Sequence, residues 1–109
     1  MTNDKFIKMV KEVFEQKLRL LERKGKIYGS DDDRLRQFRL MSAITGMEEQ
    51  QTAIILASKH FTALCGIISK REYVDFELID EITGDIINYM LLIRAIYQES
   101  YLDPNNMLE

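Results

Sequence analysis

Two carboxylates and an amide recur at helical spacing near the C-terminal end of the sequence and form its clearest candidate site. Glu81, Asp85 and Asn88 stand at positions i, i+4 and i+7, so a helix places them on one face, beside an apolar stripe. Polar groups on the shoulder of a buried helix need partners. Those partners are either basic and backbone groups in a structural network, or a hard cation such as Mg²⁺, which takes oxygen ligands. Residue pattern alone leaves both interpretations open.

The sequence around these residues is acidic. No basic residue stands between Arg71 and Arg94, and six carboxylates fall in that interval. Acids near a helix N-terminus stabilise the helix dipole, which explains Asp75 and Glu77. Asp85 lies well inside the helix, where this explanation fails, and it is therefore the strongest reason to expect a site.

Two further features could contact a phosphate or a base. Lys59 and His60 are adjacent, and a lone histidine is a poor zinc ligand. They are either a surface pair, with Lys59 bridging to an acid of the last helix, or a phosphate contact in a cleft. The glycine- and aspartate-rich segment 24–33 is either a plain connection or a place where Tyr28 stacks on a base.

Apolar periodicity predicts four helices to position these residues. The first helix is expected over about 3–24, with Gly25 as C-cap, and the second is expected to be capped by Ser30 or Asp31 and to end near Gly46. A Thr45/Glu48 capping box is expected to open the third helix, which ends near Lys70, and the fourth is expected over about 76–100. The third helix has a predicted core stripe of Ile54, Ala57, Phe61, Leu64, Cys65 and Ile68.

The last helix is apolar nearly all round from Ile86 to Ile93, which is typical of a helix buried on several sides. In so small a protein it is either the central helix or a contact with another subunit, and we expect an oligomer through it. The prediction is a single all-α domain over residues 1–102, followed by a flexible tail over 103–109.

Composition narrows the class of protein. The chain has 109 residues, 46% of them hydrophobic, and a net charge of -3, which argues against bulk nucleic-acid binding. One cysteine, Cys65, indicates a reducing compartment. No apolar run approaches the roughly 20 residues of a membrane span, and the N-terminus lacks the apolar stretch of a signal peptide. We therefore expect a cytoplasmic protein without membrane association. Motifs for nucleophilic catalysis, phosphate loops and dinucleotide binding are absent from the sequence.

Several of these pieces occur in a familiar order. Lys24-x-x-x-Tyr28-Gly29, an acid-rich segment, Gln37-Phe38, Lys59-His60 and Glu81…Gly84-Asp85…Asn88-Tyr89 follow one another over most of the chain. This order resembles small phage and prophage nucleotide-modification-associated helical proteins, which are similar to MazG-type all-α nucleoside triphosphate pyrophosphohydrolases. The resemblance implies a four-helix MazG-like bundle that oligomerises in the cytoplasm of a bacterial host.

The resemblance also implies roles for the site residues. Glu81 and Asp85 would bind Mg²⁺, whereas Tyr28, Lys59, His60 and Asn88 would bind a nucleotide. MazG-type enzymes carry a further Glu-x-x-Glu pair on the preceding helix, where this chain has Lys59-His60, so it supplies about half of the carboxylates that two-metal chemistry needs. One hypothesis is a nucleotide-binding protein which, if catalytic, is a Mg²⁺-dependent nucleoside triphosphate pyrophosphohydrolase. The alternative is a non-catalytic phage protein that acts through protein–protein contacts.

Overall fold

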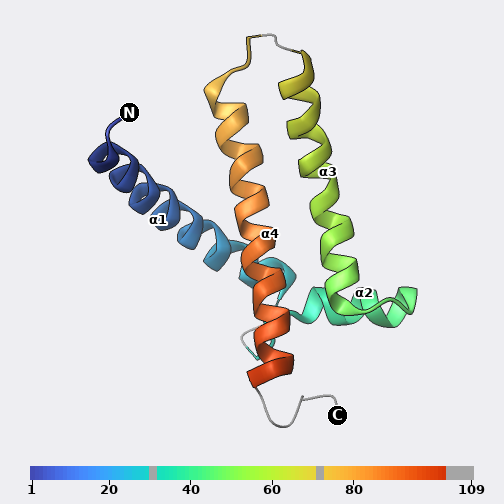
Figure 1. Ribbon diagram of the computed structural model, residues 1–109. Helices are drawn as coiled ribbons and strands as arrows, with labels where there is room; N and C mark the ends of the chain where they lie inside the picture. The colour runs from blue at the N-terminus through green and yellow to red at the C-terminus, as the bar shows by residue number, and fades with distance from the viewer. Residues whose placement is uncertain (30–31, 71–72, 103–109) are drawn as a thin grey trace. The chain divides into compact units, whose positions relative to one another are not determined.

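A computed structural model describes residues 1–29, 32–70 and 73–102 of the chain. All regular structure in these ranges is helical, and the helices are α1 (Asn3–Tyr28), α2 (Arg36–Thr45), α3 (Glu49–Lys70) and α4 (Phe76–Leu102) (Figure 1). The predicted all-α class with four helices is therefore confirmed. Residues 103–109, predicted to be a flexible tail, lie outside the described residues. Contacts divide the chain into two compact units, Met1–Arg34 and Leu35–Glu109.

The first unit is α1 with the residues that follow it. Thr2 caps the helix by accepting a hydrogen bond from the Lys5 amide at 3.2 Å. The prediction that α1 ends at Gly25 is wrong, because the helix continues to Tyr28 and the Gly29 amide donates to the Gly25 carbonyl at 3.1 Å. A Cβ at Gly25 would lie 2.9 Å from Nε of Arg34. Gly25 is thus a packing position for the Arg34 side chain and not a helix stop.

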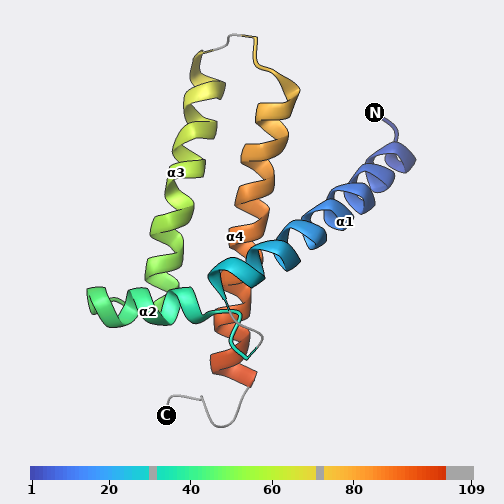
Figure 2. The ribbon, with the colours of Figure 1, turned by 180° about the vertical axis from the view of Figure 1, so that it is seen from behind.

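The second unit is built on α3 and α4, which run antiparallel beside each other, with α2 packed at the start of α3 (Figures 1 and 2). Its core lies where the three helices meet. Leu35, Phe38, Ala53 and Ile96 form the buried cluster, and Phe38 is fully buried. The small Ala53 and a second buried alanine, Ala57, leave room on α3 for close packing. Burial of a side chain such as Phe38 contributes roughly 1.5–3 kcal/mol to folding.

The start of α2 differs from the prediction. Ser30 and Asp31, predicted to cap this helix, lie outside the described residues, and α2 begins only at Arg36. Leu35 occupies the N-cap position without a side-chain capping bond, and it is buried in the core. Packing of Leu35 therefore sets this helix start. The predicted end is confirmed, because Gly46 closes α2 in the left-handed conformation at φ 75°.

The predicted Thr45/Glu48 capping box of α3 is also wrong. Thr45 is the last residue of α2, and its hydroxyl donates to the Met41 carbonyl at 2.7 Å. The Glu48 amide instead donates to Oε1 of Gln51 at 2.9 Å, three residues further on. Both pairs have capping-box spacing, but only the second flanks the true start of α3 at Glu49.

The predicted core stripe of α3 is only partly buried. Ala57 is buried and Leu64 half-buried, whereas Ile54, Phe61 and Ile68 are 48%, 38% and 67% exposed. By length and composition alone, α3 could cross a membrane. This is weak support for a span, because core helices of soluble proteins pass the same test. The prediction of no membrane association stays a prediction.

Candidate functional site

The contact between α3 and α4 brings two of the predicted site residues together. Nδ1 of His60 on α3 lies 3.4 Å from Oδ2 of Asp85 on α4, and their side chains are only 18% and 20% exposed. The imidazole also lies against Tyr89, with ring centroids 5.5 Å apart and the planes tilted by 34°. The sequence pattern placed His60 with Lys59 and Asp85 with Glu81 and Asn88, as two separate candidate features. The packing of α3 against α4 brings His60 and Asp85 into contact.

Asn88 lies three residues, about one turn, further along α4 than Asp85. It is buried, at 4% exposure, and neither its amide nitrogen nor its amide oxygen has a hydrogen-bond partner among the described residues. Buried polar groups in native proteins are almost always paired, and each unpaired one costs about 1–3 kcal/mol. Asn88 is therefore a buried polar group that the described part of the chain leaves unpaired.

The carboxylates of the predicted metal site are less closely grouped. Glu81 is exposed, whereas Asp85 is partly buried against His60. Within the described residues, no three His, Cys, Asp or Glu side chains converge as a metal site. A Mg²⁺ ion that is held by substrate phosphates needs only one or two protein carboxylates. Glu81 and Asp85 are enough carboxylates for that smaller demand, but not for a two-metal centre.

Lys59 and Tyr28 are the remaining predicted contacts. Lys59 is exposed on α3, next to His60 in sequence. Tyr28 belongs to the first unit, at the last turn of α1, and is 55% exposed. The structure thus brings His60 and Asp85 together, with Asn88 one turn away on α4, and it leaves the roles of Lys59 and Tyr28 as predictions.

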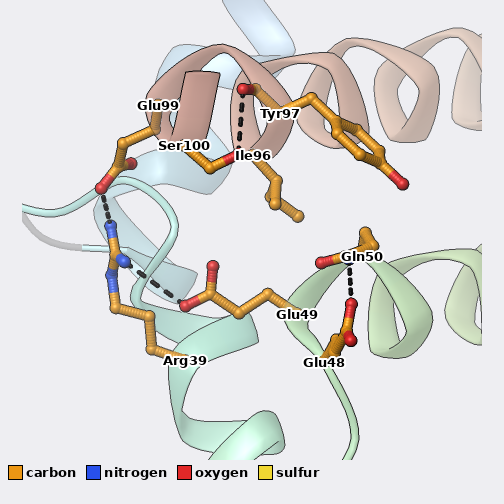
Figure 3. A pocket seen from close by; sticks show the side chains of 8 residues that line it. All are labelled: Arg39, Glu48, Glu49, Gln50, Ile96, Tyr97, Glu99 and Ser100. Atoms are coloured by element: carbon orange, nitrogen blue, oxygen red, sulfur yellow. Dashed lines mark hydrogen bonds and ion pairs between the residues drawn. The ribbon is translucent and has the colours of Figure 1, made fainter. Parts of the chain in front are cut away.

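A cavity of about 390 Å³ lies elsewhere in the second unit, between α4 and the start of α3 (Figure 3). Nη2 of Arg39 lies 2.6 Å from Oε1 of Glu99, and its Nη1 lies 3.3 Å from Oε1 of Glu49. Figure 3 shows this guanidinium between the two carboxylates on one side of the cavity, with Tyr97 on the other. The described lining is Arg39, Glu48, Glu49, Gln50, Ile96, Tyr97, Glu99 and Ser100.

The charges of this cavity do not suit a phosphate. Arg39 is the one basic residue in the described lining, and it is already engaged by two carboxylates. Because Arg39 comes from α2, Glu49 from α3 and Glu99 from α4, the three charges join the three helices of the unit. We interpret this network as structural.

Arg34 is a further partly buried polar residue, and the sequence pattern does not mark it as a site residue. Its guanidinium lies against Gly25, and its Nη1 is buried without a hydrogen-bond partner among the described residues. Burial lowers the pKa of the Arg34 guanidinium from its ordinary value, although an arginine stays charged at pH 7. The pair of glycines at residues 25 and 29 is the feature of the sequence that indicates this contact, because glycines leave room for another side chain to pack closely against the backbone.

Comparison with known proteins adds no relative: no family model, curated protein or solved structure matches this chain. The fold and the site define a class only, namely an all-helical protein with a polar cluster between two antiparallel helices. The resemblance to MazG-type proteins therefore rests on the motifs quoted above.

Proposed function

We propose that this chain is a MazG-like helical protein that binds a nucleotide beside the His60–Asp85–Asn88 cluster, in the cytoplasm of a bacterial host. The observation that supports this most is the buried, unpaired amide of Asn88. An amide offers both donors and an acceptor, as the polar edge of a base does. His60 and the neighbouring Lys59 would face the phosphates, whereas base stacking by Tyr28 stays a prediction from the sequence.

Mg²⁺ is part of the proposal. Glu81 and Asp85 would supply oxygen ligands, and the ion would supply positive charge for a bound phosphate. Since this donor set is smaller than two-metal hydrolysis requires, we propose nucleotide binding as the function. Pyrophosphohydrolysis would then be a secondary activity that depends on the same Asp85.

The test is thermal melting of the full chain with nucleoside mono-, di- and triphosphates, each with and without Mg²⁺. A ligand at about 100 times its Kd stabilises a fold by about 2.7 kcal/mol, which raises Tm by several degrees. Asp85→Asn and Asn88→Ala should abolish the rise. Asp80→Asn is the matched control, because it removes a half-buried carboxylate from the same helix outside the cluster.

The outcome is decisive in either direction. A Mg²⁺-dependent rise in Tm that survives Asp80→Asn but not Asp85→Asn supports the proposal. If no nucleotide changes Tm, and calorimetric titration detects no binding, the nucleotide proposal fails and the cluster is a structural network.

A second candidate function is a non-catalytic helical interaction protein. The specific observation in its favour is the exposed apolar surface of the long helices, including Met90 and Leu91 of α4, which are 39% and 38% exposed. These residues would form the homo-oligomer contact predicted for the last helix. In this case Asp85→Asn should leave association unchanged in sedimentation velocity, whereas Leu91→Glu should weaken it.

A further inference from the structure

The cavity between α4 and the start of α3 has an excess of negative charge (Figure 3). Arg39 is the one basic residue in its described lining, and the carboxylates of Glu49 and Glu99 share it. Glu48 adds a third carboxylate, which accepts a hydrogen bond from the neutral amide of Gln50 and pairs with no cation among the described residues. Three carboxylates and one guanidinium leave this lining with a net charge of -2.

A metal ion is a poor occupant for this charge. Ca²⁺ and Mg²⁺ gather about six or more oxygen ligands at about 2.0–2.6 Å. Within the described residues, no three His, Cys, Asp or Glu side chains converge closely enough to hold such an ion. Figure 3 shows the Glu48 carboxylate well apart from the Arg39 guanidinium that joins the other two. The spread of negative charge therefore suits a ligand whose own positive charges are separated.

The rest of the lining offers an apolar surface and an aromatic ring. Ile96 is 5% exposed, and Figure 3 shows its side chain directed from α4 toward the α3 side of the cavity. Tyr97 is 43% exposed and stacks on Tyr101, with ring centroids 6.1 Å apart and the planes tilted by 19°. The negative face of an aromatic ring attracts a nearby cation. An alkyl chain would contact Ile96, and an ammonium group would lie against Tyr97.

We propose that this cavity binds an aliphatic diamine, with one ammonium at Glu48 and the other at the two carboxylates that share Arg39. The volume of about 390 Å³ lies within the range of small-ligand pockets, about 300–1,000 Å³. The ligand supplies the charge that one guanidinium leaves uncompensated, so the Arg39 network stays intact. Tyr97 follows Asp85 by twelve residues, about 18 Å along α4, so this site is separate from the proposed nucleotide site.

The first experiment is isothermal titration calorimetry of the full chain with putrescine at low ionic strength, together with amide chemical-shift mapping by NMR. We expect a Kd of about 1 mM or tighter, with the largest shifts in residues 48–50 and 96–100. n-Butylamine has the same number of carbons but one ammonium, so it should bind about fivefold more weakly. Putrescine that produces neither heat nor shifts overturns the proposal.

Glu48→Gln tests the assignment of the site, with circular dichroism to check the fold of each variant. It should weaken putrescine binding about fivefold, because it removes the carboxylate that no described cation neutralises. Glu77→Gln is the matched control, since Glu77 is also an exposed carboxylate beside a helix start but is not part of the described lining. Tyr97→Leu keeps an apolar wall and should weaken binding about two- to fivefold. Equal effects of Glu48→Gln and Glu77→Gln overturn the proposal.

Two further measurements test other occupants of the cavity. Mg²⁺ should not displace putrescine at equal concentration, and Mg²⁺ binding that Glu48→Gln removes would make a metal ion the ligand. A lysine side chain of a second copy carries the same ammonium group, so sedimentation velocity is compared with and without putrescine. Sedimentation should be the same in both. Self-association that putrescine and Glu48→Gln each abolish would make that lysine the occupant and overturn the free diamine.

Discussion

Replacing Asn88 by leucine should stabilise the ligand-free protein, although the substitution lies at the centre of the proposed site. The Asn88 side chain is 4% exposed, and both of its polar atoms lack partners among the described residues. Leucine has the same branched arrangement of side-chain heavy atoms, is somewhat larger and has no polar atoms, so the substitution removes two unpaired groups and adds buried apolar surface. With a penalty of about 1–3 kcal/mol for an unpaired buried group, we expect a gain of about 1–3 kcal/mol after imperfect packing is allowed for.

The assay is urea unfolding followed by far-UV circular dichroism at pH 7 without nucleotide. The midpoint should rise at unchanged m-value, and Tm should rise by about 4 °C or more for each kcal/mol. Thr52→Val is the contrasting control. Thr52 is also fully buried, but its hydroxyl donates to the Glu49 carbonyl at 2.7 Å, so its loss should destabilise by about 0.5–1.5 kcal/mol.

Opposite results would refute this reasoning. If Asn88→Leu lowers the free energy of unfolding by more than about 1 kcal/mol, the amide has partners in the folded protein and its burial no longer indicates a ligand. If the variant is more stable and still shows the full nucleotide-dependent rise in Tm, Asn88 is unpaired but lies outside the binding site.

Three further substitutions test the fold. Arg39→Ala should destabilise the protein by about 1 kcal/mol in urea unfolding, because its two ion pairs are about one-third exposed, and the loss should shrink in 1 M NaCl. Gly46→Ala should cost about 1 kcal/mol in thermal melts from backbone conformation alone. The reason is that φ is 75° and that the added Cβ would meet no other side chain or backbone atom within 4 Å, whereas Gly46→Asn should cost less. Gly29→Ala should lower Tm more than Gly25→Ala, because the first places Cβ 2.8 Å from the Arg34 backbone oxygen and the second meets only the movable Arg34 side chain.

The sequence predicts the helices well where apolar periodicity is long. The starts of α1 and α4 at residues 3 and 76, and the end of α3 at residue 70, agree with the structure. The errors occur where a local signal has two meanings. Gly25 can end a helix or admit a side chain, and the structure uses it for the packing of Arg34. Thr45 matches the pattern of a helix N-cap, but it is the last residue of α2 and therefore does not cap α3.

The candidate site is predictable only in part, for a related reason. Asp85 and Asn88 are recognisable because polar residues inside an apolar helix need partners. The contact of His60 with Asp85 depends on how α3 and α4 pack, which helix spacing does not specify. The network of Arg39 likewise joins residues up to 60 positions apart in sequence, so no local pattern could identify it. Nucleotide binding, Mg²⁺ and oligomerisation remain predictions.

The antiparallel pairing of α3 and α4 also has a consequence for how quickly the second unit folds. Contacts near the connection between these helices join residues close in sequence, so the pair can form from that end at low loop-closure entropy. The cluster of Phe38, Ala53 and Ile96 lies toward the opposite end and requires contacts between residues far apart in the chain. Phe38 should therefore become buried late, and its truncation should appear in a chevron plot mainly as faster unfolding, with the folding limb nearly unchanged. The largest fully buried side chain among the described residues would then govern how long the native state persists, while having little influence on how fast that state is reached.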